Sequence, residues 1–76
     1  MNKERRKQLE KAQCLLEEAQ SIIEDCMNEE EDYRDNMPEN LMNSEKYDRA
    51  DDACDSMSSA LDNIESAISD IEEAAE

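Results

Sequence analysis

The 76-residue chain contains no glycine, histidine, tryptophan or phenylalanine, and it has a single proline. Without glycine it cannot build the glycine-rich loops that cradle phosphate groups. Without histidine it lacks the commonest general base and the commonest metal ligand. No apolar run reaches the roughly 20 residues of a membrane-spanning helix, and no hydrophobic segment follows the basic N-terminus as in a signal peptide. We therefore expect a protein that neither spans a membrane nor binds a nucleotide cofactor.

The three cysteines are odd in number and lack CxxC spacing, which favours a reducing, cytoplasmic environment. A cysteine nucleophile needs an activating neighbour, and the sequence offers neither a histidine nor a glycine-supported turn for this role. We expect no catalytic residue, no cofactor and no metal. The acidic run Glu29, Glu30, Glu31 and Asp32 leaves loose Mg²⁺ or Ca²⁺ binding as an alternative, without the central glycine of a calcium-binding loop.

Acidic side chains dominate what is present: 23 acidic against 8 basic residues, with a net charge of -15. Five basic and two acidic residues fall within residues 1–11, so this segment carries +3 and the rest of the chain carries -18. We expect the basic segment to pair with the acidic C-terminus, and a basic patch for nucleic acid or membrane is the alternative. The residues expected to pair are Arg5, Arg6 and Lys7 with Glu72, Glu73 and Glu76.

Two long stretches repeat apolar residues at alternating steps of three and four, which is the heptad pattern of a coiled coil. The a and d residues are Leu9, Ala12, Leu16, Ala19, Ile23, Cys26, Glu30, Tyr33 and Met37 in the first stretch, and Tyr47, Ala50, Cys54, Met57, Leu61, Ile64, Ile68, Ile71 and Ala75 in the second. The apolar g residues are Leu15 and Ile22, then Ala53, Ala60, Ala67 and Ala74. Such helices need a partner to cover their apolar stripe.

The pattern predicts one domain over residues 1–76, with helices over about 3–36 and 44–75 joined by a turn over about 37–43. Pro38 ends the first helix, because it disfavours helical geometry at Met37 and lacks an N–H donor. Ser44 or Asn43 is the expected N-cap of the second helix. Two long helices joined by a short loop form an antiparallel hairpin.

The heptads also predict which residues face each other across the hairpin. An a residue faces a d residue throughout if paired residue numbers sum to 80. Pairs in this register include Leu16 with Ile64, Cys26 with Cys54, and Tyr33 with Tyr47. Cys26 and Cys54 are then core residues, whereas Cys14 at f is exposed. Leu15 and Ile22 remain partly exposed to solvent beside the seam. We therefore expect two hairpins to associate as a homodimer, which would be a four-helix bundle.

Carboxylates form rows along both helices, at b and c on the first and at b and e on the second. A small domain needs a net charge of magnitude only about 2–8 for solubility. The larger charge here indicates a basic partner, although a solvated face that serves solubility alone is the alternative. The candidate partner-binding residues are Glu10, Glu17, Glu18, Glu24, Asp25, Glu31, Asp32, Asp48, Asp51, Asp55, Asp62 and Glu65.

Three segments carry a resemblance: the basic start MNKERRKQLEKA, the turn NMPENLMNSEKYDRADDA and the heptad tail LDNIESAISDIEEA. With the acidic helix between them, they resemble small, acidic helical-hairpin proteins encoded by bacteriophages and prophages. The resemblance implies expression in the cytoplasm of a bacterial host. Small acidic phage proteins include anti-restriction and anti-CRISPR inhibitors, which occupy basic nucleic-acid channels as DNA mimics.

The sequence therefore predicts an all-α protein, an antiparallel two-helix coiled-coil hairpin that is not an enzyme. The first functional hypothesis is a phage-type inhibitor that blocks a basic DNA- or RNA-binding channel of a host defence protein, for example a CRISPR effector or a restriction enzyme. Such an inhibitor does not itself bind nucleic acid. The alternative is an acidic coiled-coil adaptor or structural oligomerisation protein that mimics nothing.

Overall fold

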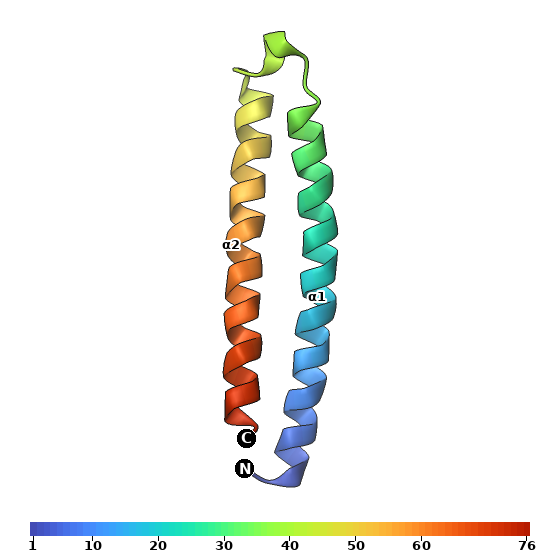
Figure 1. The fold of residues 1–76 in the computed structure, drawn as a ribbon, viewed down its shortest axis with the longest axis vertical. Coiled ribbons are helices and arrows are strands. Elements are labelled where there is room, and N and C mark those ends of the chain that lie inside the picture. Colours follow the sequence, from blue (N-terminus) through green and yellow to red (C-terminus); the bar gives the residue numbers. More distant parts are fainter.

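The chain folds into two long antiparallel helices joined by a short connection (Figure 1). A computed structural model describes all residues, Met1–Glu76. Helix α1 spans Lys3–Asp35, the 3-10 helix η1 spans Glu39–Leu41, and α2 spans Glu45–Ala74. The predicted helical hairpin is thereby confirmed, and each long helix ends within one residue of the expected position. Neither long helix contains a stretch apolar enough to cross a bilayer.

Side chains that cap the backbone fix where the helices begin. The Oδ1 atom of Asn2 accepts a hydrogen bond of 2.8 Å from the N–H of Arg5 at the start of α1. The Oγ atom of Ser44 accepts one of 3.3 Å from the N–H of Tyr47 at the start of α2. Each bond satisfies an N–H group that has no partner within its own helix. Ser44 rather than Asn43 is therefore the N-cap of α2.

Replacing Ser44 with alanine should destabilise the hairpin by about 1 kcal/mol, the usual contribution of a serine N-cap. The measurement is the urea midpoint of unfolding, followed by circular dichroism. Ser59→Ala is the control, because Ser59 is exposed in the middle of α2, where alanine favours the helix. An equal loss of stability in both variants would contradict a capping role for Ser44.

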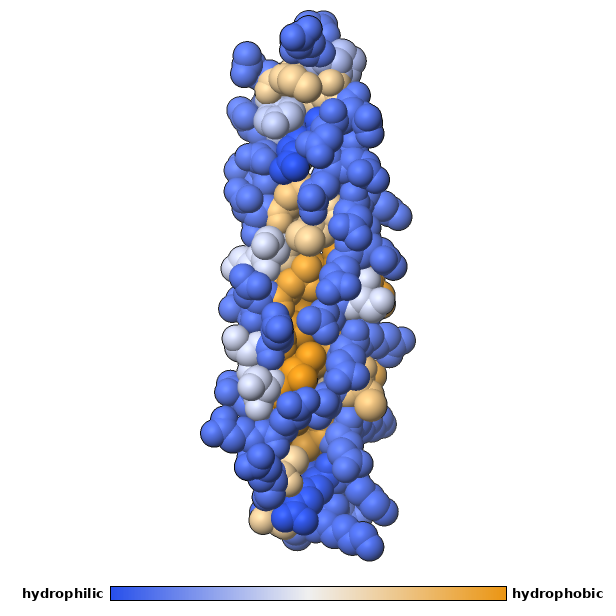
Figure 2. All heavy atoms as spheres, viewed as in Figure 1, coloured by the Kyte–Doolittle hydropathy of each residue, from blue (hydrophilic) through white to orange (hydrophobic).

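The hairpin is a thin rod with very little interior. Its Cα atoms extend over 59 × 14 × 12 Å, and only 3 of 76 residues are buried: Met37, Ala50 and Cys54. Each helix packs against a single neighbour, so most seam residues are only half-buried. Figure 2 shows the result on one face, an apolar strip along the seam with hydrophilic side chains on both helices beside it.

The seam of α2 follows the predicted heptads, since its a and d residues from Tyr47 to Ala75 are all half-buried or buried. The seam of α1 departs from them towards the loop. Cys26 and Tyr33 at d are exposed, and Met27 and Arg34 at the following e positions are half-buried instead. The predicted place of Cys26 in the core is therefore wrong, and Tyr33, predicted at d of the seam, is exposed.

The pitch of an α-helix explains this departure. A helix with 3.6 residues per turn drifts by about 20° per heptad unless it supercoils. Over the four heptads between Leu9 and Met37, this drift turns d positions outward and e positions towards the partner helix. Cys26 at d is therefore exposed, whereas Cys54 on α2 is buried.

Two hydrogen bonds between side chains cross from α1 to α2. Gln13 Nε2 donates to Glu72 Oε1 at 3.0 Å, and Arg34 Nη1 donates to Asp51 Oδ1 at 2.9 Å. All four residues occupy e positions, which lie side by side along one edge of an antiparallel seam. Both pairs sum to 85 rather than 80, as expected for side chains that lean towards the N-terminus of their own helix. The two pairs are therefore compatible with the predicted register.

Candidate functional site

The two cross-helix bonds divide the hairpin into two long faces. We call the side that carries Gln13–Glu72 and Arg34–Asp51 the bridged face. The opposite side, where the g residues lie, is the open face; its apolar residues are Leu15, Ile22, Ala53, Ala60 and Ala67. In a heptad, b lies next to e and c lies next to g. Carboxylates at b therefore border the bridged face, and those at c border the open face.

The predicted acidic residues divide unequally between these faces. Nine border or lie on the bridged face: Glu10, Glu17, Glu24 and Glu31 from α1, and Asp48, Asp51, Asp55, Asp62 and Glu65 from α2. Three border the open face: Glu18, Asp25 and Asp32. Ten of the twelve are exposed, whereas Glu31 and Asp51 are half-buried. The antiparallel pairing thus gathers acidic rows from both helices along one side of the rod.

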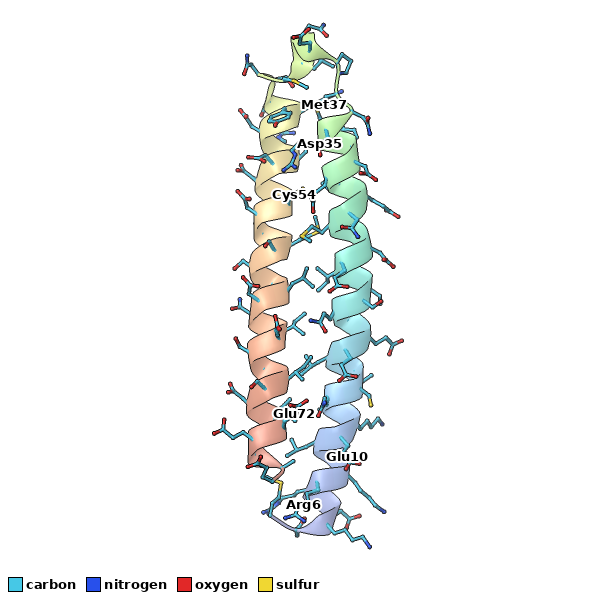
Figure 3. The ribbon with its side chains drawn as sticks, in the orientation of Figure 1. Arg6, Glu10, Asp35, Met37, Cys54 and Glu72 are labelled. Atoms are coloured by element: carbon cyan, nitrogen blue, oxygen red, sulfur yellow. The ribbon has the colours of Figure 1, made fainter.

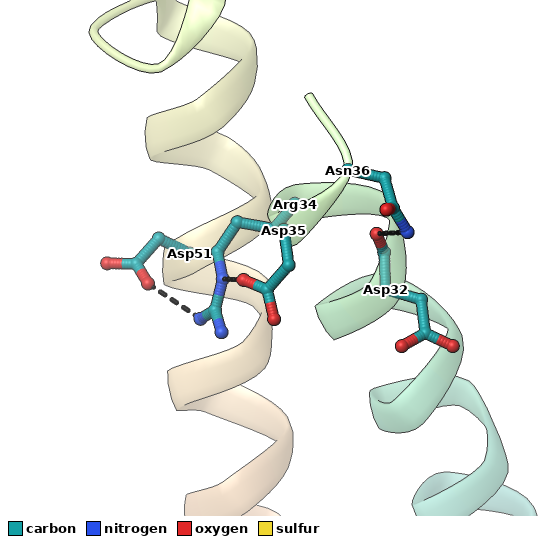
Figure 4. Close-up of polar contacts among 5 residues, drawn as sticks. All are labelled: Asp32, Arg34, Asp35, Asn36 and Asp51. Carbon is teal, nitrogen blue, oxygen red and sulfur yellow. Dashed lines mark hydrogen bonds and ion pairs between the residues drawn. The ribbon is translucent and has the colours of Figure 1, made fainter. Parts of the chain in front are cut away.

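Arg34 modifies this acidic face near the loop (Figure 4). Its Nε atom donates to Asp35 Oδ1 at 3.0 Å, and its Nη1 atom donates to Asp51 Oδ1 at 2.9 Å. The hydrogen bond that Arg34 donates to Asp35 raises the pKa of Arg34, and burial opposes that rise. Because Asp51 is held by a guanidinium, it offers a partner less negative charge than the free carboxylates at b.

The ideal heptad does not predict Arg34 as a site residue, because it leaves the e positions outside the seam. One signal was present in the sequence. Arg34 is the only basic residue of α1 beyond Lys11, in a segment otherwise rich in acid. Allowing for the drift of a straight helix would have placed it opposite Asp51.

The predicted pairing of the basic N-terminus with Glu72, Glu73 and Glu76 is wrong. The ion pairs of the structure are Arg34–Asp35, Arg34–Asp51 and Arg49–Glu45, and none involves residues 1–11. Glu72 instead accepts from Gln13, so residues 5–7 lie at or beyond the level where α2 ends. Figure 3 shows this end of the rod, with Arg6 and Glu72 labelled.

The acidic run near the loop does not assemble a metal site. No group of three or more Cys, Asp or Glu side chains is placed to hold a metal ion. Along a helix, residues 29–32 point to different sides of the axis, and only Glu29 and Asp32 share one face. The candidate site is therefore a charged surface rather than a coordination centre.

The three thiols differ in their surroundings. Cys14 is exposed, as predicted, and Cys54 is buried between the helices. Burial raises the pKa of Cys54, and the nearby Arg34 lowers it in part. Because the thiolate is the reactive form, both low exposure and a raised pKa protect Cys54.

In dilute protein at pH 8, we expect a disulfide reagent such as Ellman's to modify Cys14 at least tenfold faster than Cys54. The reason is the lower thiolate fraction and the poorer access at Cys54. The rate at each site is read by peptide mass spectrometry after quenching. Equal rates in the folded protein, with helicity intact, would contradict the burial of Cys54; equal rates in urea are the expected control.

The charge of the rod is dense along its length. Fifteen net negative charges over 59 Å give one charge per about 4 Å. One strand of a DNA duplex carries one charge per about 3.4 Å of axis. The rod thus carries, per unit length, nearly the charge of one nucleic-acid strand. No protein-family model, curated protein or solved structure matches this chain.

Proposed function

We propose that this protein is a non-enzymatic inhibitor that occupies a basic nucleic-acid-binding channel by presenting its carboxylates in place of phosphates. The observation that carries the proposal is the arrangement of acidic rows from α1 and α2 along the bridged face. The proposed targets are host defence proteins with such channels, for example a CRISPR effector or a restriction enzyme. The protein itself does not bind nucleic acid.

The spacing of the acidic groups supports this proposal. Successive residues of one row, such as Glu17 and Glu24, are seven positions apart, or about 10.5 Å along the axis. Rows on both helices, with the e carboxylates between them, fill these intervals on the bridged face. A channel lined with Lys and Arg side chains meets charge at nearly the linear density of a nucleic-acid strand. Rigid helices hold these groups in place, so little conformational entropy is lost on binding.

Binding to a panel of purified channel-containing proteins across a salt series tests the proposal. Long-range attraction between opposite charges is screened within about 8 Å at physiological ionic strength. We expect a member of the panel to bind at low salt, with an association rate that falls steeply as salt rises. Binding that is insensitive to salt, or a panel without any binding member at low salt, would contradict mimicry.

The adaptor function is the second candidate, and the open face favours it. Leu15 and Ile22 are large apolar residues of α1 that are exposed beside the seam. An adaptor would bind its partner through these apolar residues, and its acid would serve solubility alone. Its binding would tolerate salt and would be lost when Leu15 or Ile22 is changed.

We also propose that the protein is a homodimer, in which two hairpins form a four-helix bundle. The rod buries only 3 residues, and its large exposed apolar residues include Leu15, Ile22 and Tyr33. A single two-helix seam leaves little apolar surface covered for a chain of this size. Light scattering should report twice the chain mass of 8.8 kDa at micromolar concentration. A monomer mass at high micromolar concentration would contradict the dimer.

A further inference from the structure

The open face combines exposed apolar side chains with small ones. Leu15 is 56% exposed and Ile22 is 59% exposed on α1. Opposite them, α2 presents the half-buried alanines Ala53, Ala60 and Ala67 at seven-residue intervals. The exposed Cys26 and Tyr33 extend the same face towards the loop, where Lys46 and Arg49 border shallow hollows beside Tyr33. Small residues allow close approach of another helix, and the larger ones supply the apolar area it would cover.

The surface area of the hairpin indicates how large a partner this face needs. A compact monomer of 8.8 kDa exposes about 4,800 Å². The hairpin exposes 5791 Å², roughly 1,000 Å² more. A stable interface of standard size buries about 800 Å² per partner. The excess therefore matches what each protomer contributes to one ordinary protein–protein interface.

We propose that the open face binds the open face of a second copy of this chain, with the two rods inverted so that their loops lie at opposite ends. A two-fold axis perpendicular to the rods then sets α1 against α1 of the second copy, antiparallel, and α2 against its counterpart. This inference rests on the proposed homodimer and adds its face and its orientation. It leaves both bridged faces, with their acidic rows, on the outside.

One axis position satisfies both helix pairs. If the axis passes between Leu15 and Ile22, then Leu15 of each copy meets Ile22 of the other. Across the hairpin, the cross-helix bonds and the predicted register place this level of α1 beside the interval between Ala60 and Ala67 of α2. The same axis therefore crosses α2 between Ala60 and Ala67, so that in both copies these two alanines lie on either side of it. Large residues pair with large ones on α1 while small residues let the α2 helices approach closely.

Charge selects the inverted orientation. Residues 1–11 carry +3 and make no ion pair within the hairpin, whereas residues 24–35 carry seven acidic side chains and one basic one. Inversion places the basic segment of one copy beside the acidic segment of the other, at both ends of the dimer. With the loops at the same end, like segments would lie together, and their repulsion would oppose association. The basic N-terminus, which does not pair with the C-terminus of its own chain, thereby pairs with the acidic segment of the second copy.

The native thiols test whether the open face is covered. Cys26 at d lies on the open-face side of α1, and Cys14 at f lies on its outer side. As protein concentration rises through dimerisation, the rate of Cys26 modification by a maleimide should fall at least tenfold, while the rate at Cys14 stays constant. Unchanged rates at both thiols, in a sample that light scattering shows to be dimeric, would overturn the proposed face.

A pair of matched variants provides a second test of the face. Leu15→Lys with Ile22→Lys places two charges on the open face without touching the seam within the hairpin. Ser21→Lys with Asn28→Lys adds the same charges at exposed f positions of α1. We expect the first variant to remain helical but to dimerise at least tenfold more weakly, and the second to dimerise as the wild type does. Equal dimerisation of both variants would overturn the proposal.

A distance between spin labels tests the orientation. Lys7→Cys is labelled in a Cys14→Ser, Cys26→Ser background, in which the remaining Cys54 is buried. When Leu15 meets Ile22, Lys7 lies 23 residues along the rod from its counterpart, which predicts a separation of about 35 Å or more. With the loops at the same end, the labels would be separated only by the width of the bundle, within about 25 Å. The shorter distance would overturn the inversion, and a monomer would overturn the dimer; neither result bears on target binding, which is measured separately.

Discussion

Removing the carboxylates of both b rows should weaken target binding at least a hundredfold. The changes are Glu17, Glu24 and Glu31 to Gln on α1, and Asp48, Asp55 and Asp62 to Asn on α2. Each row alone should account for about tenfold, and rows on separate helices should act nearly additively. Glutamine keeps the helix propensity of glutamate, and these side chains lie outside the a and d seam, so the fold is retained. The measurement is the dissociation constant for the target at fixed salt.

A matched control removes the same kind of charge from the other side of α1. Glu18→Gln, Asp25→Asn and Asp32→Asn neutralise the c row, which borders the open face. We expect this triple variant to bind the target within about threefold of the wild type, since only the general attraction declines. Equal losses from the b and c rows of α1 would show that total charge matters and that the bridged face has no special role.

Replacing Ile64 with aspartate should unfold the hairpin. Ile64 is a d residue of α2, half-buried against α1, and burial of an isoleucine side chain contributes up to about 1.5–3 kcal/mol. The substitution removes this term and places another carboxylate beside a seam in a chain that already carries -15. Because a 76-residue rod has a small stability to begin with, we expect loss of most helical circular dichroism at 25 °C. Leu16→Asp on α1 should behave in the same way.

Ser66→Asp is the control for this prediction, since Ser66 is exposed on α2 two residues from Ile64. It adds the same charge without removing any apolar contact, so helicity should remain near that of the wild type. If Ile64→Asp kept full helicity and an unchanged melting temperature, the a and d seam would not be what holds the two helices together.

The elements of this fold could be predicted because each is fixed by local features. Pro38 ends the first helix, Ser44 caps the second, and an unbroken heptad runs from Tyr47 to Ala75. The antiparallel arrangement then follows from the shortness of the connection. The acidic rows could be placed on the surface for the same reason, because their positions depend only on the period of the helix.

The details of pairing could not be predicted, because they depend on how much each helix supercoils. An ideal heptad keeps Cys26 and Tyr33 in the seam, whereas the drift of α1 replaces them with Met27 and Arg34. The contact between Arg34 and Asp51 follows from that drift. The N-terminal pairing failed for a related reason: small changes in register decide whether residues 5–7 meet the end of α2 or extend past it. The period of the sequence determines which face of each helix a residue lies on, whereas the three-dimensional register determines which residues of α1 and α2 contact each other.

Competition between this protein and nucleic acid for one target tests the central claim most directly. A fluorescent duplex is bound to the target protein, and the hairpin is added at constant salt while anisotropy is followed. The account predicts full displacement of the duplex, with an inhibition constant equal to the dissociation constant of the hairpin and no binding of the duplex by the hairpin alone. A ternary complex, in which the duplex keeps its affinity while the hairpin is bound to the same target molecule, would contradict the account.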